Sequence, residues 1–116
     1  MSKIKMAEKS DWKTEEMPQE RDSFVLKRNF TEEQMQKLRY GNIPTEMEDK
    51  WFWYMEGNTL FAYRSWTGFC IYIIEFSSEG LHTVTVNRNR EQYKRTDIEK
   101  ETKVLNELLD WWSGTL

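Results

Sequence analysis

Alternating apolar and polar residues along the chain predict five strands, and two stretches with helical spacing predict two helices. The two-residue period of a half-buried strand runs through residues 23–30, 50–56, 59–65, 69–76 and 81–87. Apolar residues recur at helical spacing in residues 31–41 and in residues 96–114. The order β-α-β-β-β-β-α is typical of an α+β fold, a four- to five-stranded antiparallel sheet with two helices on one face.

Both predicted helices begin with a capping signal. Thr31 and Gln34 have the spacing of a capping box, and Thr96 and Glu99 repeat it at the second helix. A glycine follows each helical stretch, as is common at a left-handed C-terminal cap. The apolar side of the second helix leaves Glu101 on the side expected to face water.

The hairpin in the middle of the chain has a predictable register. Residues 50–56 and 59–65 flank a two-residue Gly-Asn turn, so Trp51 should lie opposite Arg64 and Phe52 opposite Tyr63. One side of the hairpin, which we name the Phe–Tyr face, carries Phe52, Tyr54, Phe61 and Tyr63. The other side, which we name the Trp face, carries Trp51, Trp53, Met55, Leu60, Ala62 and Arg64.

Extending the register assigns the later strands to these two faces. A three-residue turn before the third hairpin strand would add Ile71 and Ile73 to the Phe–Tyr face, and Cys70, Tyr72 and Ile74 to the Trp face. A two-residue turn would reverse that parity. Continuing the register puts Val84 and Val86 with the isoleucines. The Phe–Tyr face then becomes almost wholly apolar, and we expect both helices to cover it.

This expectation leaves the Trp face without a cover from the chain itself. Three explanations remain open for such an aromatic surface: the sheet curls or a second copy packs there as a homodimer, a planar ligand stacks there, or another protein binds there. Exposed apolar patches of more than a few hundred Å² mark interaction sites in general.

Composition and charge bound the remaining possibilities. Residues 1–22 are rich in charge and lack an apolar period, which predicts a disordered polar tail before a single α+β domain in residues 23–116. The formal net charge of −3 argues against nucleic acid as a partner. The chain has no apolar run of membrane-spanning length, and its single cysteine forms no intramolecular disulfide, so we expect a cytoplasmic protein.

The most suggestive chemistry lies at the end of the hairpin. Arg64 is predicted within cation–π reach of Trp51 and is followed by Ser65, Trp66, Thr67 and Gly68. A guanidinium beside two hydroxyl groups and a glycine amide can hold a phosphate or a carboxylate. The alternative is that Arg64 forms an ion pair with the acidic residues Glu48 or Asp49.

Other candidate groups carry less weight. Cys70 lies in an apolar strand, where burial keeps a thiol unreactive, and His82 is expected at an exposed or edge position. Glu48 and Asp49 could serve as a general base or bind a hard cation, but a solvated loop explains them as well. No metal-ligand spacing or cofactor motif is found, and the basic segment 87–95 fits a solvated connection.

Residues 24–112 resemble a small bacterial domain family of unknown function. The similarity is carried by Met47 to Phe52, by Arg64 to Gly68 and by Cys70 to Tyr72. Members of that family occur beside ADP-ribose-processing modules such as macrodomains or ADP-ribosylglycohydrolases, which implies an ADP-ribose or related nucleotide ligand. Relatives often carry histidine before the arginine, where this chain has Tyr63, so a role of that histidine does not transfer.

The leading hypothesis is a non-enzymatic module that binds a flat, phosphate-bearing small molecule. The ligand would stack on Trp51, Trp53 or Trp66, and its anion would be held by Arg64, Ser65, Thr67 and Gly68. The first alternative is a homodimer or protein-interaction domain that uses the aromatic sheet face. The second is a small hydrolase that uses Glu48 or Asp49 as its base.

Overall fold

The computed structural model describes residues 6–93 and 98–114. Within them, the elements follow the predicted order, preceded by a short 3-10 helix. They are η1 (Lys9–Asp11), β1 (Arg21–Lys27), α1 (Glu32–Tyr40), β2 (Trp51–Glu56), β3 (Thr59–Arg64), β4 (Cys70–Glu75), β5 (Leu81–Asn87) and α2 (Ile98–Trp112).

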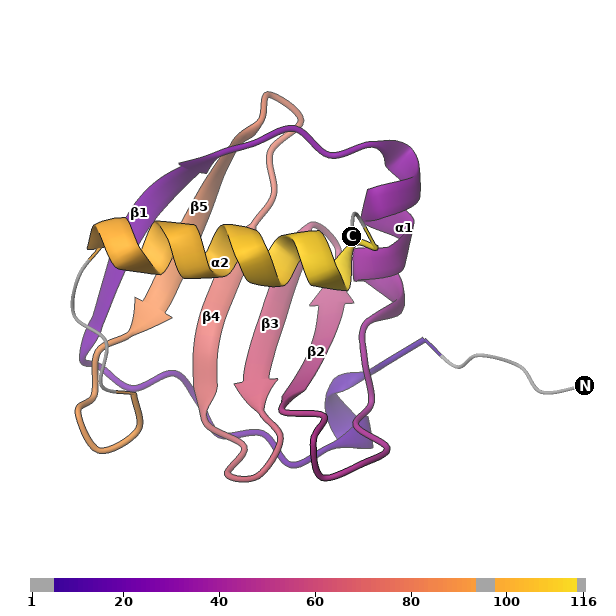
Figure 1. Cartoon of the computed structure of the whole chain (residues 1–116). Helices are drawn as coiled ribbons and strands as arrows, with labels where there is room; N and C mark the ends of the chain where they lie inside the picture. The colour runs from indigo at the N-terminus through magenta and orange to yellow at the C-terminus, as the bar shows by residue number, and fades with distance from the viewer. Residues whose placement is uncertain (1–5, 94–97, 115–116) are drawn as a thin grey trace, which may run out of the picture.

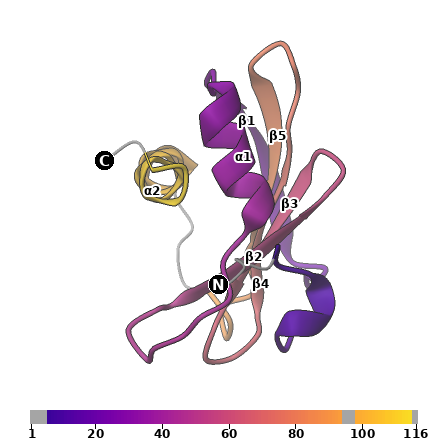
Figure 2. The ribbon, with the colours of Figure 1, turned by 90° about the vertical axis from the view of Figure 1, so that its right-hand side faces the viewer.

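The strands form one antiparallel sheet in the order β1-β5-β4-β3-β2. Helix α2 runs across the strands, and α1 lies near the β2 edge (Figure 1). The view from the side shows both helices on one side of the sheet and the N-terminal segment on the other (Figure 2). The predicted α+β class, with two helices on one face, is confirmed.

The capping signals at the two ends of α1 form the contacts that the sequence predicts. The Thr31 side chain accepts a hydrogen bond from the Gln34 backbone N–H, and the Gln34 side chain accepts one from Thr31 N–H. Gly41 ends α1 with a φ of 73°, and a Cβ there would lie 2.3 Å from the carbonyl oxygen of Trp53. Only glycine fits both the conformation and the contact. Thr96, the predicted cap of α2, lies outside the described residues.

The register of the central hairpin is confirmed at every pair, including Trp51 with Arg64 and Phe52 with Tyr63. The next strand is only partly as predicted, because a β-bulge shifts the register between Ala62 and Tyr63. Cys70 therefore pairs with Tyr63 and joins the Phe–Tyr face, and Ile71 packs with the Trp face. Both are the reverse of their assignment from the sequence.

The helices cover the Trp face, so the predicted cover of the sheet is wrong. Tyr72 pairs with Val86 and Ile74 with Val84, so both valines join the Trp face and not the Phe–Tyr face predicted for them. Trp51 and Trp53 are only 8% and 6% exposed, and the indole of Trp112 on α2 stacks on Trp53 at a centroid distance of 4.5 Å. The aromatic surface that the sequence left open is the main core.

The Phe–Tyr face is covered by the N-terminal segment that the sequence predicts to be disordered. Ala7 and Met17 are buried against this face, and the ring of Trp12 stacks on Phe52 at 6.3 Å. Backbone hydrogen bonds tie the segment down, among them Ala7 N–H to Tyr40 O at 2.7 Å. The structure thus differs from the expectation for residues 6–22. Three spaced apolar residues suffice to dock a segment that has no period of its own.

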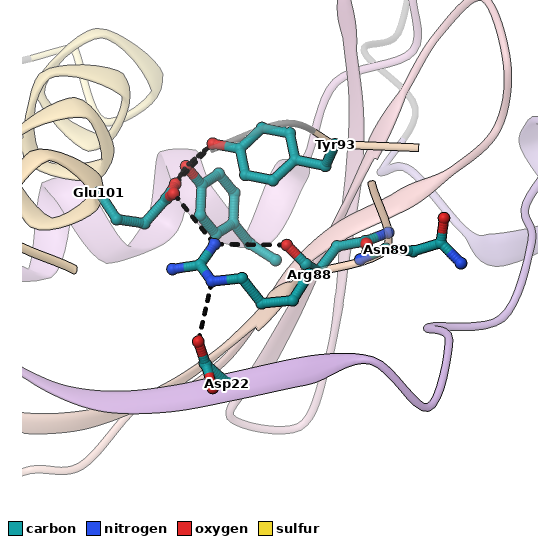
Figure 3. A network of polar contacts seen from close by, with 7 residues as sticks. Asp22, Arg88, Asn89, Tyr93 and Glu101 are labelled. Carbon is teal, nitrogen blue, oxygen red and sulfur yellow. Dashed lines mark hydrogen bonds and ion pairs between the residues drawn. The ribbon is translucent and has the colours of Figure 1, made fainter. Parts of the chain in front are cut away.

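A buried polar network joins α2 to the sheet (Figure 3). Glu101 has no solvent exposure, which corrects its predicted position on the wet side of the helix. Its carboxylate accepts hydrogen bonds from the hydroxyl groups of Tyr72 and Tyr93 and pairs with Arg88 at 3.4 Å. Arg88 also pairs with Asp22 on β1 at 2.9 Å. Burial raises the pKa of the Tyr72 hydroxyl, so this group stays protonated and donates.

Candidate functional site

The candidate site lies at the end of β3, where Arg64 projects beside a tight turn. The guanidinium carbon of Arg64 lies 4.6 Å from the centroid of the Trp51 ring, so the predicted cation–π pair is present. The turn is closed by hydrogen bonds from Gly68 N–H to Arg64 O at 2.8 Å and from Arg64 N–H to Phe69 O at 3.0 Å. The backbone of Arg64 is therefore held in place by the sheet and by the turn.

A surface groove of about 420 Å³ opens beside this arginine. Its walls come from three separate segments of the chain, the start of β2, the turn after β3 and the connection after β5. The lining residues are Lys50, Arg64, Trp66, Thr67, Phe69, Glu91 and Gln92. Its size falls within the range of roughly 300–1,000 Å³ that is typical of small-molecule sites.

Trp66 provides the aromatic wall of the groove. Its side chain is 64% exposed, yet its indole N–H donates a hydrogen bond to the backbone oxygen of Met47 at 3.0 Å. This bond fixes the orientation of the ring while leaving much of its surface open to solvent. An immobilised, exposed indole can stack on a planar ligand with little loss of side-chain entropy.

Lys50 and Arg64 give the groove its positive charge. Neither residue forms an ion pair within the part of the chain that the structure describes. The alternative that Arg64 pairs with Glu48 or Asp49 is therefore not realised. Asp49 instead accepts hydrogen bonds from the side chain of Asn42, at 3.0 and 3.2 Å. With Glu91 as the one acidic lining residue, two cations face one carboxylate.

The predicted anion clamp is only partly available to a ligand. The Ser65 hydroxyl is buried and donates to the backbone oxygen of Asp49 at 2.8 Å, and the Gly68 N–H is used within the turn. Thr67 is exposed, and its oxygen accepts from Phe69 N–H at 3.2 Å, so its hydroxyl proton remains able to donate. Of the predicted clamp, Arg64 and Thr67 keep groups that can reach a bound anion.

Of the three tryptophans predicted to stack on a ligand, the structure leaves one exposed. Trp51 and Trp53 lie beneath α2, where Trp51 stacks on Tyr72 at 5.9 Å and Trp53 on Trp112. The exposed platform that the sequence predicts for them is not formed, because the sheet presents this face to the helix. Trp66 lies in the turn, outside the sheet, and so escapes that burial.

The groove also contains residues that sequence reasoning missed. These residues are Lys50, Phe69, Glu91 and Gln92, of which Lys50 and Phe69 adjoin predicted site residues in the sequence. The side that Glu91 and Gln92 add follows from the pairing of β4 with β5, which brings the end of β5 to the start of β4. No local sequence motif predicts a contact of this kind, because it depends on how distant strands pair.

The remaining reactive side chains serve the fold. Burial raises the pKa of the Cys70 thiol to about 12, so it stays protonated and unreactive near neutral pH, as predicted. His82 is buried, against the prediction of an exposed or edge position, and both of its ring nitrogens are engaged. Nδ1 accepts from Ser77 N–H at 3.0 Å, and Nε2 lies 2.7 Å from the backbone oxygen of Arg28.

The described ranges contain neither a candidate metal site nor a helix that could span a membrane. Residues 6–93 and 98–114 contain no group of three or more histidine, cysteine or acidic side chains that could hold a metal ion. No helix among them has the length and apolar character needed to cross a membrane.

Comparisons of the chain with protein-family models, with curated proteins and with solved structures found no match. The resemblance to a bacterial domain family therefore stays a prediction.

Proposed function

We propose that this protein is a small-molecule binding module whose groove beside Arg64 holds a planar, phosphate-bearing, nucleotide-like ligand of the ADP-ribose or NAD type. The ring of the ligand stacks on Trp66. Its phosphate groups lie against Arg64 and Lys50, and Thr67 donates a hydrogen bond to the same anion. This arrangement keeps the arginine clamp proposed from the sequence and moves the stacking platform from the sheet to the turn.

The observation that carries the proposal is one groove that combines a fixed, exposed indole with two cations free of ion pairs within the described part of the chain. A planar group and an anion must meet in one molecule to use all three residues. Stacking of a base on an aromatic side chain contributes about 1–3 kcal/mol. Hydrogen bonds to a charged group add about 1.5–3 kcal/mol each.

Calorimetric titration with ADP-ribose, NAD and cyclic nucleotides tests the proposal. Trp66→Ala should weaken binding by about tenfold or more, because it removes one stacking partner. Trp111→Ala is the matched control, since Trp111 is also a tryptophan and is 63% exposed, but it lies on α2 outside the groove. Equal losses in both variants, or no heat with any ligand of the panel, would refute the proposed site.

The role of the cations is tested separately. Arg64→Gln shortens the side chain and removes its charge, and Lys50→Gln removes the second charge from an exposed position. Each should weaken binding of the nucleotides but leave any binding of adenosine, which has no phosphate, unchanged. Lys27→Gln, at an exposed position on β1, controls for net charge. Binding that follows net charge alone would contradict a clamp at Arg64.

No observation in the structure specifically supports either alternative function, the interaction domain or the hydrolase. Dimerisation through the aromatic sheet face lacks its premise, because α2 covers the Trp face and the N-terminal segment covers the Phe–Tyr face. The proposed hydrolase would need Glu48 or Asp49 beside the ligand. These two residues line a different pocket from the groove of Arg64.

A further inference from the structure

A second pocket, of about 390 Å³, lies between the loop before β2 and the C-terminal end of α2. The groove at Arg64 shares no lining residue with it. Its rim carries three carboxylates, those of Glu46, Glu48 and Asp49, and none of its lining residues is a cation. The pocket therefore has the opposite charge to the groove proposed above.

The three carboxylates of the rim differ in their exposure to solvent and in their hydrogen-bond partners. Glu46 and Glu48 are exposed and form no ion pair with any residue that the structure describes. Asp49 is partly buried and held by Asn42. Since no three acidic side chains in the described ranges come close enough to share a metal ion, the rim favours an extended cation over a chelated one.

Tryptophan side chains form the apolar wall of the pocket. Trp53 and Trp112 stack on one another, and Trp51 meets Trp112 edge-on at 5.4 Å with an interplanar angle of 69°. Trp111 is largely exposed at the mouth. Its open indole can cover the methylene stem or the charged end of a cationic side chain.

Two indole N–H groups at this wall are available as donors. Trp53 donates to the backbone oxygen of Leu38 at 3.1 Å, but the N–H groups of Trp51 and Trp112 have no hydrogen-bond partner among the described residues. Both side chains are more than nine-tenths buried, and neither nitrogen is sealed from solvent. Since both residues line the pocket and neither N–H has an acceptor among the described residues, these two donors are open to an acceptor that a bound ligand supplies.

We infer that this pocket binds a basic peptide segment of a partner protein. A lysine or arginine side chain of the peptide lies among Glu46, Glu48 and Asp49 and packs on Trp111. The backbone carbonyl groups of the peptide accept hydrogen bonds from the indoles of Trp51 and Trp112. A peptide supplies the cation and the acceptors together, whereas a simple organic cation supplies only the first and a nucleic acid is repelled by the rim.

The test uses heteronuclear NMR of the full chain with assigned indole N–H resonances. The probe is the peptide acetyl-Gly-Lys-Gly-Arg-Gly-amide, and its counterpart has glutamate in place of both basic residues. We expect the basic peptide to shift the resonances of Trp51 and Trp112 and the acidic peptide to shift neither. Failure of the basic peptide to move them, or equal shifts with tetramethylammonium chloride, would overturn the inference.

A pair of charge variants separates specific contact from bulk attraction. Glu46→Gln with Glu48→Gln should weaken binding of the basic peptide by about fivefold, because two rim ion pairs are lost. Glu75→Gln with Glu79→Gln removes the same charge from exposed positions outside the pocket and should leave binding unchanged. Equal weakening in both double variants would refute the pocket. Because Trp66 lies outside it, Trp66→Ala should leave peptide binding intact.

Discussion

Glu101 shows how far a single buried charge can decide the position of a helix. Its carboxylate lies without solvent exposure between α2 and the sheet, and three side chains from other parts of the chain satisfy it. Such a group stabilises the fold only while all partners remain, because an unpaired buried charge costs several kcal/mol. The network therefore fixes where α2 crosses the strands.

Glu101→Ala should lower the free energy of unfolding by about 3–5 kcal/mol, because it leaves Arg88 with a buried charge short of one partner. Glu101→Gln keeps an acceptor for Tyr72 and Tyr93 and should cost less, about 1–3 kcal/mol. Urea denaturation followed by circular dichroism measures both. Glu107→Gln, at an exposed position on the same helix, is the control. If all three variants unfold alike, the network does not hold the helix.

At the scale of the element, the N-terminal segment acts as the second cover of the sheet. Trp12 stacks on Phe52, and its indole N–H donates to the backbone oxygen of Ser65 at 2.8 Å. Glu15 N–H donates to Gly68 O at 2.8 Å, so the segment also contacts the turn that carries Trp66. Docking of this segment and the shape of the proposed groove are therefore linked.

Trp12→Ala should destabilise the protein by about 2–3 kcal/mol, less than the 3–5 kcal/mol for a fully buried tryptophan because Trp12 is half-buried. The variant should also bind the dye ANS, since the Phe–Tyr face loses part of its cover. Thermal unfolding and dye fluorescence measure the two effects, with Trp111→Ala as the control at an exposed indole. A stable variant without dye binding would mean that the segment does not protect this face.

The same elements show what a sequence can and cannot predict. The Gly-Asn turn sets the hairpin register by local chemistry, so the contact of Arg64 with Trp51 follows from the sequence. The β-bulge between β3 and β4 has no local signal, and it places Cys70 and Ile71 on the faces opposite to those predicted. The pairing of Val84 with Ile74 then decided which face the helices cover, a long-range choice that alternation alone leaves open.

At the scale of the whole molecule, the candidate site was predictable in its centre and not at its margins. Arg64, Trp66 and Thr67 are close in sequence, so their proximity needs no tertiary fold. Glu91 and Gln92 reach the groove only through the sheet. The loss of Trp51 and Trp53 from the site has the same origin, because their burial depends on where α2 lies.

Both faces of the sheet are covered by parts of the same chain, and we therefore expect the protein to be a monomer. The large apolar side chains that stay exposed belong to separate segments, among them Val25 on β1, Met47 in the loop before β2, and Trp111 on α2. Sedimentation velocity over a wide range of concentrations should give one species of monomer mass. A dimer that persists on dilution and dissociates in Trp111→Ala would instead assign the mouth of the second pocket to self-association, and would remove the case for a separate peptide partner.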